Sequence, residues 1–260
     1  MNDKHRRPTR PQPVEEIEGQ LEGRNALQEA LRSGRTIDKV FIASGETDRG
    51  LQRLAAEAKE AGAVVVPVDR RKLDAMSTTH AHQGVITLAA AHEYATIEDI
   101  LEEAAQRGEN ALIVICDELT DPHNLGAILR SAECAGAHGV IIPKRRSVGL
   151  TATVAKASAG AVEYMKVARV TNINHAIAQL KEQGVWVFGT AAEGSIPMYK
   201  ADLTGPAAIV IGSEGDGMSP LVRKNCDVTV HIPMNGRITS LNASAAASIL
   251  LYEAVRQRLG

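Results

Sequence analysis

Hydrophobic residues recur along this chain in two long segments, and the first segment extends to about residue 93. Two helical stripes and three short apolar runs alternate within it, at residues 27–31, 39–43, 51–58, 63–66 and 84–88. The stripes predict helices and the apolar runs predict strands. Helices and strands that alternate on this scale indicate a small α/β domain over residues 17–93.

The second segment, residues 109–260, is longer and more apolar. Short apolar runs predict strands at 111–116, 140–142, 185–188, 207–211 and 228–232. Helical patterns fall between them, at 124–135, 173–183, 220–225 and 241–258. Apolar strands that alternate with helices are typical of a parallel sheet covered on both faces. A polar stretch at 94–108 separates the two segments and is interpreted as a linker.

The first 16 residues combine four basic residues with three prolines. Such a segment has little apolar surface to bury and is predicted to be a disordered basic tail. Its role is open between a solubilising tail and a weak tether for RNA.

Composition narrows the classes of partner. The formal net charge is −2, so an RNA-binding surface would need basic residues gathered locally. Aromatic residues make up 3% of the chain, which disfavours base stacking as the main mode of binding.

Cysteine and histidine usage points to the cytoplasm and away from metal chemistry. The three cysteines lie far apart and form no CxxC pair, so buried, reduced thiols are expected. The eight histidines show no spacing typical of metal ligands, and no metal is expected. Without a signal sequence or a long apolar run, neither secretion nor membrane insertion is expected.

Three motifs follow predicted strands of the second segment. The first, DPHNLGAILR at 121–130, makes a turn into a helix in which Asn124 is interpreted as the N-cap and Arg130 lies nearly two turns inside. The second, IVIGSEGDGM at 209–218, carries glycines that allow close approach of a ligand, but in an order different from the dinucleotide-binding fingerprint. The third, IPMNGRITSLNAS at 232–244, leads through a loop into another helix.

Together, the order and spacing of these motifs resemble those of the SpoU/TrmH family of the SPOUT superfamily, over residues 111–259. Gly23-Arg24-Asn25 and His82-Gln83-Gly84 resemble the L30-like domain of the members directed at rRNA. The resemblance implies a trefoil-knotted parallel sheet (the α/β-knot fold) behind an L30-like α/β domain. It also implies a homodimer that uses S-adenosylmethionine to methylate a ribose 2'-hydroxyl of RNA.

The resemblance carries residue roles with it. Donor-binding positions fall on Thr190, Ala191, Gly212, Glu214, Gly215, Ile232, Met234 and Leu241. Catalytic positions fall on Asn124, Arg130, Glu214, Ser240 and Asn242. Ile232 and Leu241 would supply apolar walls for adenine, and Gly212 would remove a side chain that blocks it.

Arg130 is the residue that such enzymes are often said to use for activating the hydroxyl. A guanidinium is effectively never deprotonated in proteins, so we expect a clamp for phosphate and for developing negative charge rather than a base. The residues Arg24, Lys144, Arg145 and Arg146 are candidates for RNA binding through phosphates. A merely solvated basic loop is nearly as good an interpretation of the run at 144–146.

The expected function is therefore 2'-O-methylation of RNA, most specifically of a guanosine in 23S rRNA. The same chemistry on tRNA is one alternative, disfavoured by the L30-like domain. A non-catalytic RNA-binding or ribosome-assembly protein is another, disfavoured by the intact Asn124, Arg130 and Asn242. An oxidoreductase with a dinucleotide fits poorly because the glycine order differs.

Overall fold

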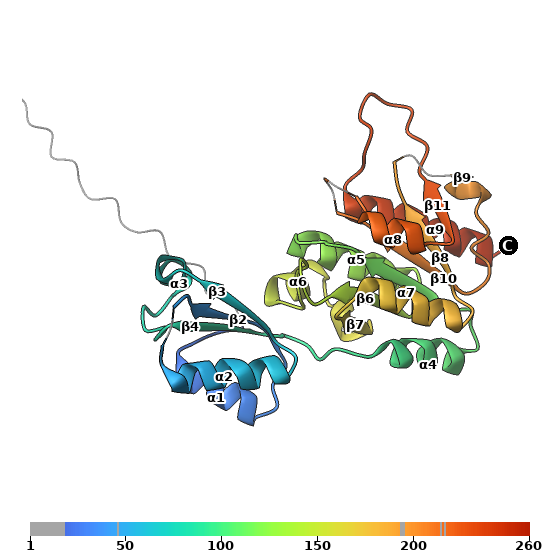
Figure 1. Cartoon of the computed structure of the whole chain (residues 1–260). Coiled ribbons are helices and arrows are strands. Elements are labelled where there is room, and N and C mark those ends of the chain that lie inside the picture. The colour runs from blue at the N-terminus through green and yellow to red at the C-terminus, as the bar shows by residue number, and fades with distance from the viewer. Residues whose placement is uncertain (1–18, 46, 193–195, 214, 216) are drawn as a thin grey trace, which may run out of the picture.

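The computed structural model describes residues 19–45, 47–192, 196–213, 215 and 217–260. These residues form two α/β domains joined in sequence (Figure 1). We call them the front domain, from β1 to β4, and the rear domain, from α4 to α9. The predicted basic tail, residues 1–16, lies outside the described residues.

The front domain is built on a mixed sheet with the strand order β1-β4-β2-β3. It contains β1 (Gln20–Glu22), α1 (Arg24–Arg32), β2 (Ile37–Ala43), α2 (Arg49–Glu60), β3 (Val64–Val68), α3 (Arg70–Met76) and β4 (Val85–Ala89). Helices α1 and α2 pack on one face through Leu27, Leu51 and Ala58. The short α3 covers part of the other face through Leu73. The pattern of apolar residues did not reveal β1 or α3.

The rear domain is built on a parallel sheet with the strand order β7-β6-β5-β10-β8-β11-β9 (Figure 1). It contains α4 (Ile97–Arg107), β5 (Leu112–Cys116), α5 (Pro122–Cys134), β6 (Gly139–Pro143), α6 (Ala152–Ala157), η1 (Ala161–Glu163), β7 (Val167–Val170), α7 (Ile173–Glu182), β8 (Trp186–Thr190), β9 (Ile196–Pro197), η2 (Met198–Lys200), β10 (Ala207–Ile211), α8 (Pro220–Asn225), β11 (Val228–His231) and α9 (Ala243–Arg258).

Helices cover both faces of this sheet, which explains its nearly continuous apolar strands. Helices α5, α6 and α9 contribute Leu129, Val154 and Leu250 to the core on one face. Helices α4, α7 and α8 contribute to the core on the other face. The five strands expected from the apolar runs are present with small shifts of their ends, and β7, β9 and α6 were not foreseen.

Residues 94–108 are more than the linker that their polarity suggested. They carry α4, which begins with a capping box between Thr96 and Asp99 and ends at Gly108 in the left-handed conformation. Ile97 and Ile100 are buried in the rear-domain core. The expectation failed because a helix with one apolar stripe is mostly polar in composition.

The three cysteines were expected to be buried, and only one of them is fully buried. Cys116 is buried on β5, Cys226 is half-buried, and Cys134 is exposed at the end of α5. Cys134 therefore does not follow the expectation of buried thiols.

Candidate active site

A pocket lies where strands β8, β10 and β11 end. Because these strands are parallel, their carboxyl ends meet at one edge of the sheet, and the loops that follow them converge there. The loop residues and the start of α9 enclose about 540 Å³. Pockets of roughly 300–1,000 Å³ are typical of sites for small molecules and cofactors.

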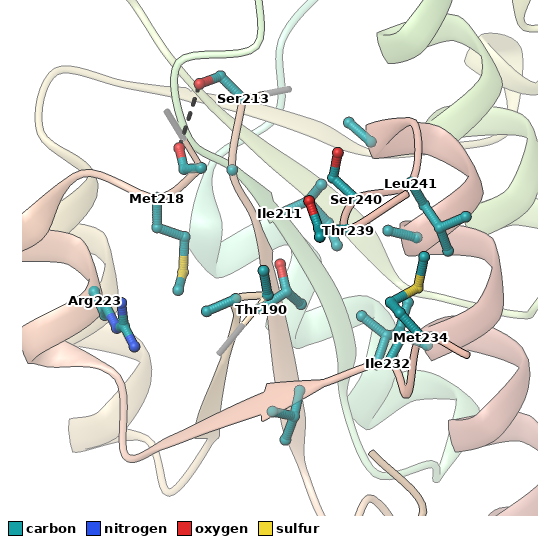
Figure 2. Close-up of a pocket in the computed structure, with 18 of the residues that line it drawn as sticks. Thr190, Ile211, Ser213, Met218, Arg223, Ile232, Met234, Thr239, Ser240 and Leu241 are labelled. Carbon is teal, nitrogen blue, oxygen red and sulfur yellow. Dashed lines mark hydrogen bonds between the residues drawn. The ribbon is translucent and has the colours of Figure 1, made fainter. Parts of the chain in front are cut away.

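The lining of the pocket is apolar on one side and carries hydroxyl groups across its middle (Figure 2). Ile232, Met234 and Leu241 lie together on the side formed by the 232–241 loop, and Arg223 lies on the opposite side, on α8. Hydroxyl groups come from Thr190, Ser213, Thr239 and Ser240. This arrangement suits a ligand with a flat apolar ring and a polar remainder.

The glycine loop after β10 closes on itself. The amide of Ser213 donates to the carbonyl of Gly217 at 3.0 Å, and the amide of Gly217 donates back to Ser213 at the same distance. A Cβ on Gly212 would lie 2.2 Å from the carbonyl carbon of Gly217. Gly212 is thus required by the close approach of its own loop, and its role beside adenine stays a prediction.

Two of the predicted catalytic residues meet between α5 and α9. The Nδ2 group of Asn242 donates to Oδ1 of Asn124 at 2.9 Å. Asn242 is also the N-cap of α9, since its Oδ1 accepts from the amides of Ser244 and Ala245. The bond therefore ties the start of α9, which follows the 232–241 wall of the pocket, to the buried Asn124.

Asn124 is not the N-cap that the sequence suggested. Asp121 caps α5 by accepting from the amide of His123 at 2.8 Å, and Pro122 occupies the first turn. Asn124 lies inside the first turn, where its side chain donates to Asp121 at 3.1 Å. Helix α5 therefore begins at Pro122, directly after Asp121, whereas the prediction placed its start after Asn124.

The predicted donor-binding residues that the structure describes all line the pocket, namely Thr190, Ala191, Gly212, Gly215, Ile232, Met234 and Leu241. Ser240, predicted as catalytic, lines it too. Glu214 lies outside the described residues. Arg130 is exposed on α5 and is absent from the described lining of the pocket.

The four RNA-binding candidates are not gathered into one patch. Arg24 pairs with Asp48 at 2.7 Å at the end of the front domain where β4 begins. Arg146 pairs with Glu118 at 2.9 Å, Arg145 is exposed and Lys144 is half-buried. Lys144 and Arg145 come directly after β6, so these two candidates lie at the carboxyl edge of the rear sheet.

The three sequence motifs did not identify all of the residues that line the pocket. Arg223 comes from α8, outside all three motifs, and Val230 comes from the middle of β11. Only the alternation of β11 could have indicated Val230, and no signal indicated Arg223. Ser213 and Met218 belong to the second motif, and its spacing could have assigned them.

Cys116 lies in the strand core and does not line the pocket. Burial raises the pKa of the Cys116 thiol to about 12, and the charge of Asp117 adds to the effect. Within the described residues, no group of three or more His, Cys, Asp or Glu is placed to hold a metal ion. In the same part of the chain, no helix combines the length and hydropathy needed to cross a membrane.

The fold and pocket define a class: a two-domain α/β protein with a cofactor-sized site at the carboxyl edge of a parallel sheet. Comparison with known proteins gives the family. Residues 111–252 match the model of the SpoU rRNA Methylase family. Residues 20–95 match the model described as RNA 2'-O ribose methyltransferase substrate binding. The chain belongs to the SpoU/TrmH family of RNA 2'-O-ribose methyltransferases.

Individual relatives cover nearly the whole chain. YacO of Bacillus subtilis (strain 168), assigned to the TrmH family of tRNA/rRNA methyltransferases, is 48% identical over 236 residues, 91% of this chain and 94% of its own. The SpoU methyltransferase AviRb of Streptomyces viridochromogenes, solved with AdoMet, gives a TM-score of 0.60 at 25% identity and covers 93% of this chain and 90% of its own. A TrmH/SpoU tRNA modifying enzyme of A. aeolicus gives 0.53 at 27% identity, with 62% and 85% covered.

The protein is thus a methyltransferase that takes its methyl group from S-adenosylmethionine. The pocket fits this donor in size, and its lining offers apolar side chains for adenine and hydroxyl groups for the polar parts. The rear domain has the SPOUT fold, and the front domain is the substrate-binding domain.

Proposed function

We propose that this enzyme methylates the ribose 2'-hydroxyl of a guanosine in 23S rRNA. The observation that carries the proposal is the complete front domain, which matches a substrate-binding model and lies against the rear domain. The A. aeolicus tRNA modifying enzyme, in contrast, aligns with only 62% of this chain. The enzyme would act in the cytoplasm, where it meets rRNA.

We propose that the pocket holds the donor with its adenine against Ile232, Met234 and Leu241. Thr190, Ala191, Gly212 and Gly215 would border the remainder of the donor through main chain and small side chains, and Glu214 would steady the second motif. When bound, S-adenosylmethionine supplies an electrophilic methyl group. Convergence of three separate loops on one pocket is consistent with the trefoil knot expected of the family.

Asn124 and Asn242 are proposed to organise the site rather than to contact the reacting atoms. Their hydrogen bond fixes the start of α9, and Ser240 lies two residues before that start, at the pocket. Holding reacting groups within a fraction of an ångström is a large part of the rate that such sites give.

Arg130 is proposed to bind a phosphate beside the target ribose and to stabilise negative charge as the 2'-oxygen loses its proton. Its guanidinium stays protonated, so it serves as a donor of hydrogen bonds. Because Arg130 is exposed and outside the described lining of the pocket, we propose that it acts on the pocket of a second copy in a homodimer. The active site would then be complete only in the dimer.

Ribose-methylation mapping of rRNA and tRNA from cells with and without the protein tests the proposed target. We expect one guanosine of 23S rRNA to lose its 2'-O-methyl group when the protein is absent. Loss of a methyl group from tRNA alone would contradict the rRNA target and favour the alternative.

A further inference from the structure

The front domain meets the rear domain at the loop that follows β6, residues 144–151, which we call the bridging loop. Arg169 on β7 donates to Asp38 on β2 at 2.6 Å, and each of these two side chains is 6% exposed. The hydroxyl of Tyr94, from the segment between β4 and α4, donates to the same carboxylate at 2.8 Å. A buried ion pair and a tyrosine thus join the two domains beside this loop.

The end of the bridging loop is held against this group of side chains. The amide of Leu150 donates to the hydroxyl of Tyr94 at 2.9 Å, and the carbonyl of Leu150 accepts from the amide of Ala91 at 2.8 Å. A Cβ on Gly149 would lie 2.8 Å from Cγ of Asp38 and from the hydroxyl of Tyr94. A larger residue would not fit there, so the front domain is in direct contact with the backbone of the loop.

The middle of the bridging loop is bonded to the loop that leads into the first motif. Residues 117–121 connect β5 to α5, and Leu119 among them is buried. The amide of Val148 and the hydroxyl of Ser147 both donate to the carbonyl of Leu119, each at 3.0 Å. The two loops follow neighbouring parallel strands, so both lie at the edge of the sheet where β10 ends in the donor pocket.

Each of these two loops contains a residue other than glycine in the left-handed conformation. The φ angle is 57° for Glu118 and 55° for Arg146. Such conformations cost energy and persist where surrounding contacts impose them. The side chains of the two residues pair at 2.9 Å, but a pair this exposed contributes little. The loops therefore depend on their buried contacts, which include the hydrogen bonds to Leu119.

The first motif begins where this series of contacts ends. Asp121, the last residue before α5, caps the helix and accepts from the side chain of Asn124. Asn124 in turn accepts from Asn242 at the start of α9, and Arg130 lies further along α5. Contacts thus lead from Asp38 in the front domain, through the bridging loop, to the residues proposed to organise the site and to bind the substrate.

We propose that Tyr94 and Ser147 are positioning residues for methyl transfer. Tyr94 fixes the bridging loop against the substrate-binding domain, and Ser147 fixes the first motif against the bridging loop. RNA held by the front domain and the groups that act on its ribose then keep one relative placement, on which the rate of transfer depends. The proposal rests on the proposed function, in particular on the roles of Asn124 and Arg130.

The test uses the full-length protein and three variants. Tyr94→Phe removes the hydroxyl that bonds Asp38 and Leu150 and keeps the ring. Ser147→Ala removes the hydroxyl that bonds Leu119 and leaves the bond from the amide of Val148 to the same carbonyl. The third variant combines both changes. The measured quantity is the single-turnover rate of methyl transfer to saturating, transcribed 23S rRNA from labelled S-adenosylmethionine, and calorimetry gives donor affinity.

Two control variants separate positioning from a general loss of stability. Tyr199→Phe changes an exposed tyrosine on η2 in the same way as Tyr94→Phe. Asp202→Ala removes hydrogen bonds to Thr204 before β10, at the opposite edge of the sheet. Urea unfolding of every variant measures stability, and the controls should transfer the methyl group at the rate of the wild type.

We expect each single variant to lower the single-turnover rate by about 10- to 100-fold, since small misplacements far from the chemistry can cost about 100-fold. Donor affinity should stay within a few-fold of the wild type. The double variant should be only slightly slower than the slower single variant, because residues that act in series do not add. Wild-type rates in both single variants would overturn the proposal, as would a double variant whose loss is the product of the two single losses.

Amide hydrogen exchange tests the same contacts without activity. Tyr94→Phe should speed exchange at the amide of Val148, which bonds Leu119 and has no bond to Tyr94 itself, and Tyr199→Phe should not. Unchanged exchange at Val148 in Tyr94→Phe would overturn the proposal. A wild type that transfers no methyl group to 23S rRNA would contradict the proposed function, and the exchange result would still decide whether Tyr94 fixes the bridging loop.

Discussion

At the scale of single residues, the question of most consequence is how Arg130 works. Its side chain is exposed on α5 and reaches no described part of the pocket in its own chain. In the proposed dimer, Arg130 meets the substrate only when RNA and a second copy complete the site, and a permanently charged guanidinium there acts as a clamp rather than a base. This difference can be measured.

We predict that Arg130→Ala lowers the single-turnover methylation rate by about 100- to 1,000-fold, the cost of removing one donor to a developing oxyanion. Donor affinity should stay within a few-fold of the wild type. Arg130→Lys should recover only part of the rate, because it retains charge without the planar fork. A rising limb near neutral pH that depends on Arg130 would contradict the clamp and favour a base.

Asn242 allows the capping role and the hydrogen bond to Asn124 to be separated. Asn242→Ala removes the N-cap of α9, which costs about 0.5–2 kcal/mol, and also removes a bond to a buried amide. Asn242→Ser keeps a capping oxygen but is too short to donate to Asn124, so its unfolding midpoint in urea should fall less. Both variants should bind the donor more weakly, as calorimetry can measure. Equal stability of the two variants would contradict this division.

At the scale of elements, the loop between α3 and β4 is held by one carboxylate. Glu22 on β1 accepts hydrogen bonds from Ser77, Thr78 and Thr79. Within this loop His80 and Gln83 have positive φ, a conformation that costs energy outside glycine. Burial raises the pKa of Glu22, but the hydrogen bonds outweigh burial and lower it well below 4.5.

A lowered pKa in the folded state predicts a pH dependence. Glu22 should stabilise the fold fully above pH 4.5, the ordinary value, and lose that contribution as pH falls toward its folded value. We expect Glu22→Gln to be less stable than the wild type at pH 7, and the gap to shrink below pH 4.5. Urea unfolding across this range measures it, with the exposed Glu60→Gln as control. A gap that widens in acid would contradict the account.

Much of the architecture could be predicted at this scale because it depends on local patterns. The apolar runs gave the central strands, and the three motifs gave the loops at the pocket. Helix α4 could have been found as well, since Thr96 and Asp99 form a capping box and Ile97, Ile100 and Ala104 follow at helical spacing. The polarity of the remaining residues concealed it.

At the scale of the whole molecule, contacts between distant parts of the sequence could not be predicted. Nothing near Asp38 indicates that its partner is Arg169, because a buried ion pair depends on how two domains pack. The same holds for Arg223, which enters the pocket from a helix outside the motifs. Patterns along a chain report local structure and carry no information on such pairings.

We predict that Asp38→Ala destabilises the protein by about 3–5 kcal/mol, because it leaves Arg169 buried without its partner. Asp38→Asn should cost less, since its amide oxygen can still accept from Tyr94. Glu29→Ala, which removes an exposed pair with Arg32, should cost under about 1 kcal/mol. Urea unfolding of the full chain measures all three. Similar stability of the Ala variant and the wild type would show that the junction is open in solution.

The measurement that bears most directly on the central claim is methyl transfer by the purified protein. Transcribed 23S rRNA and tRNA are each incubated with S-adenosylmethionine carrying a labelled methyl group, digested to nucleosides and analysed by mass spectrometry. The label should appear as 2'-O-methylguanosine from 23S rRNA, and Arg130→Ala should abolish it while still binding the donor. Label found only on a base, or no transfer by a protein that binds the donor and the RNA, would contradict the account.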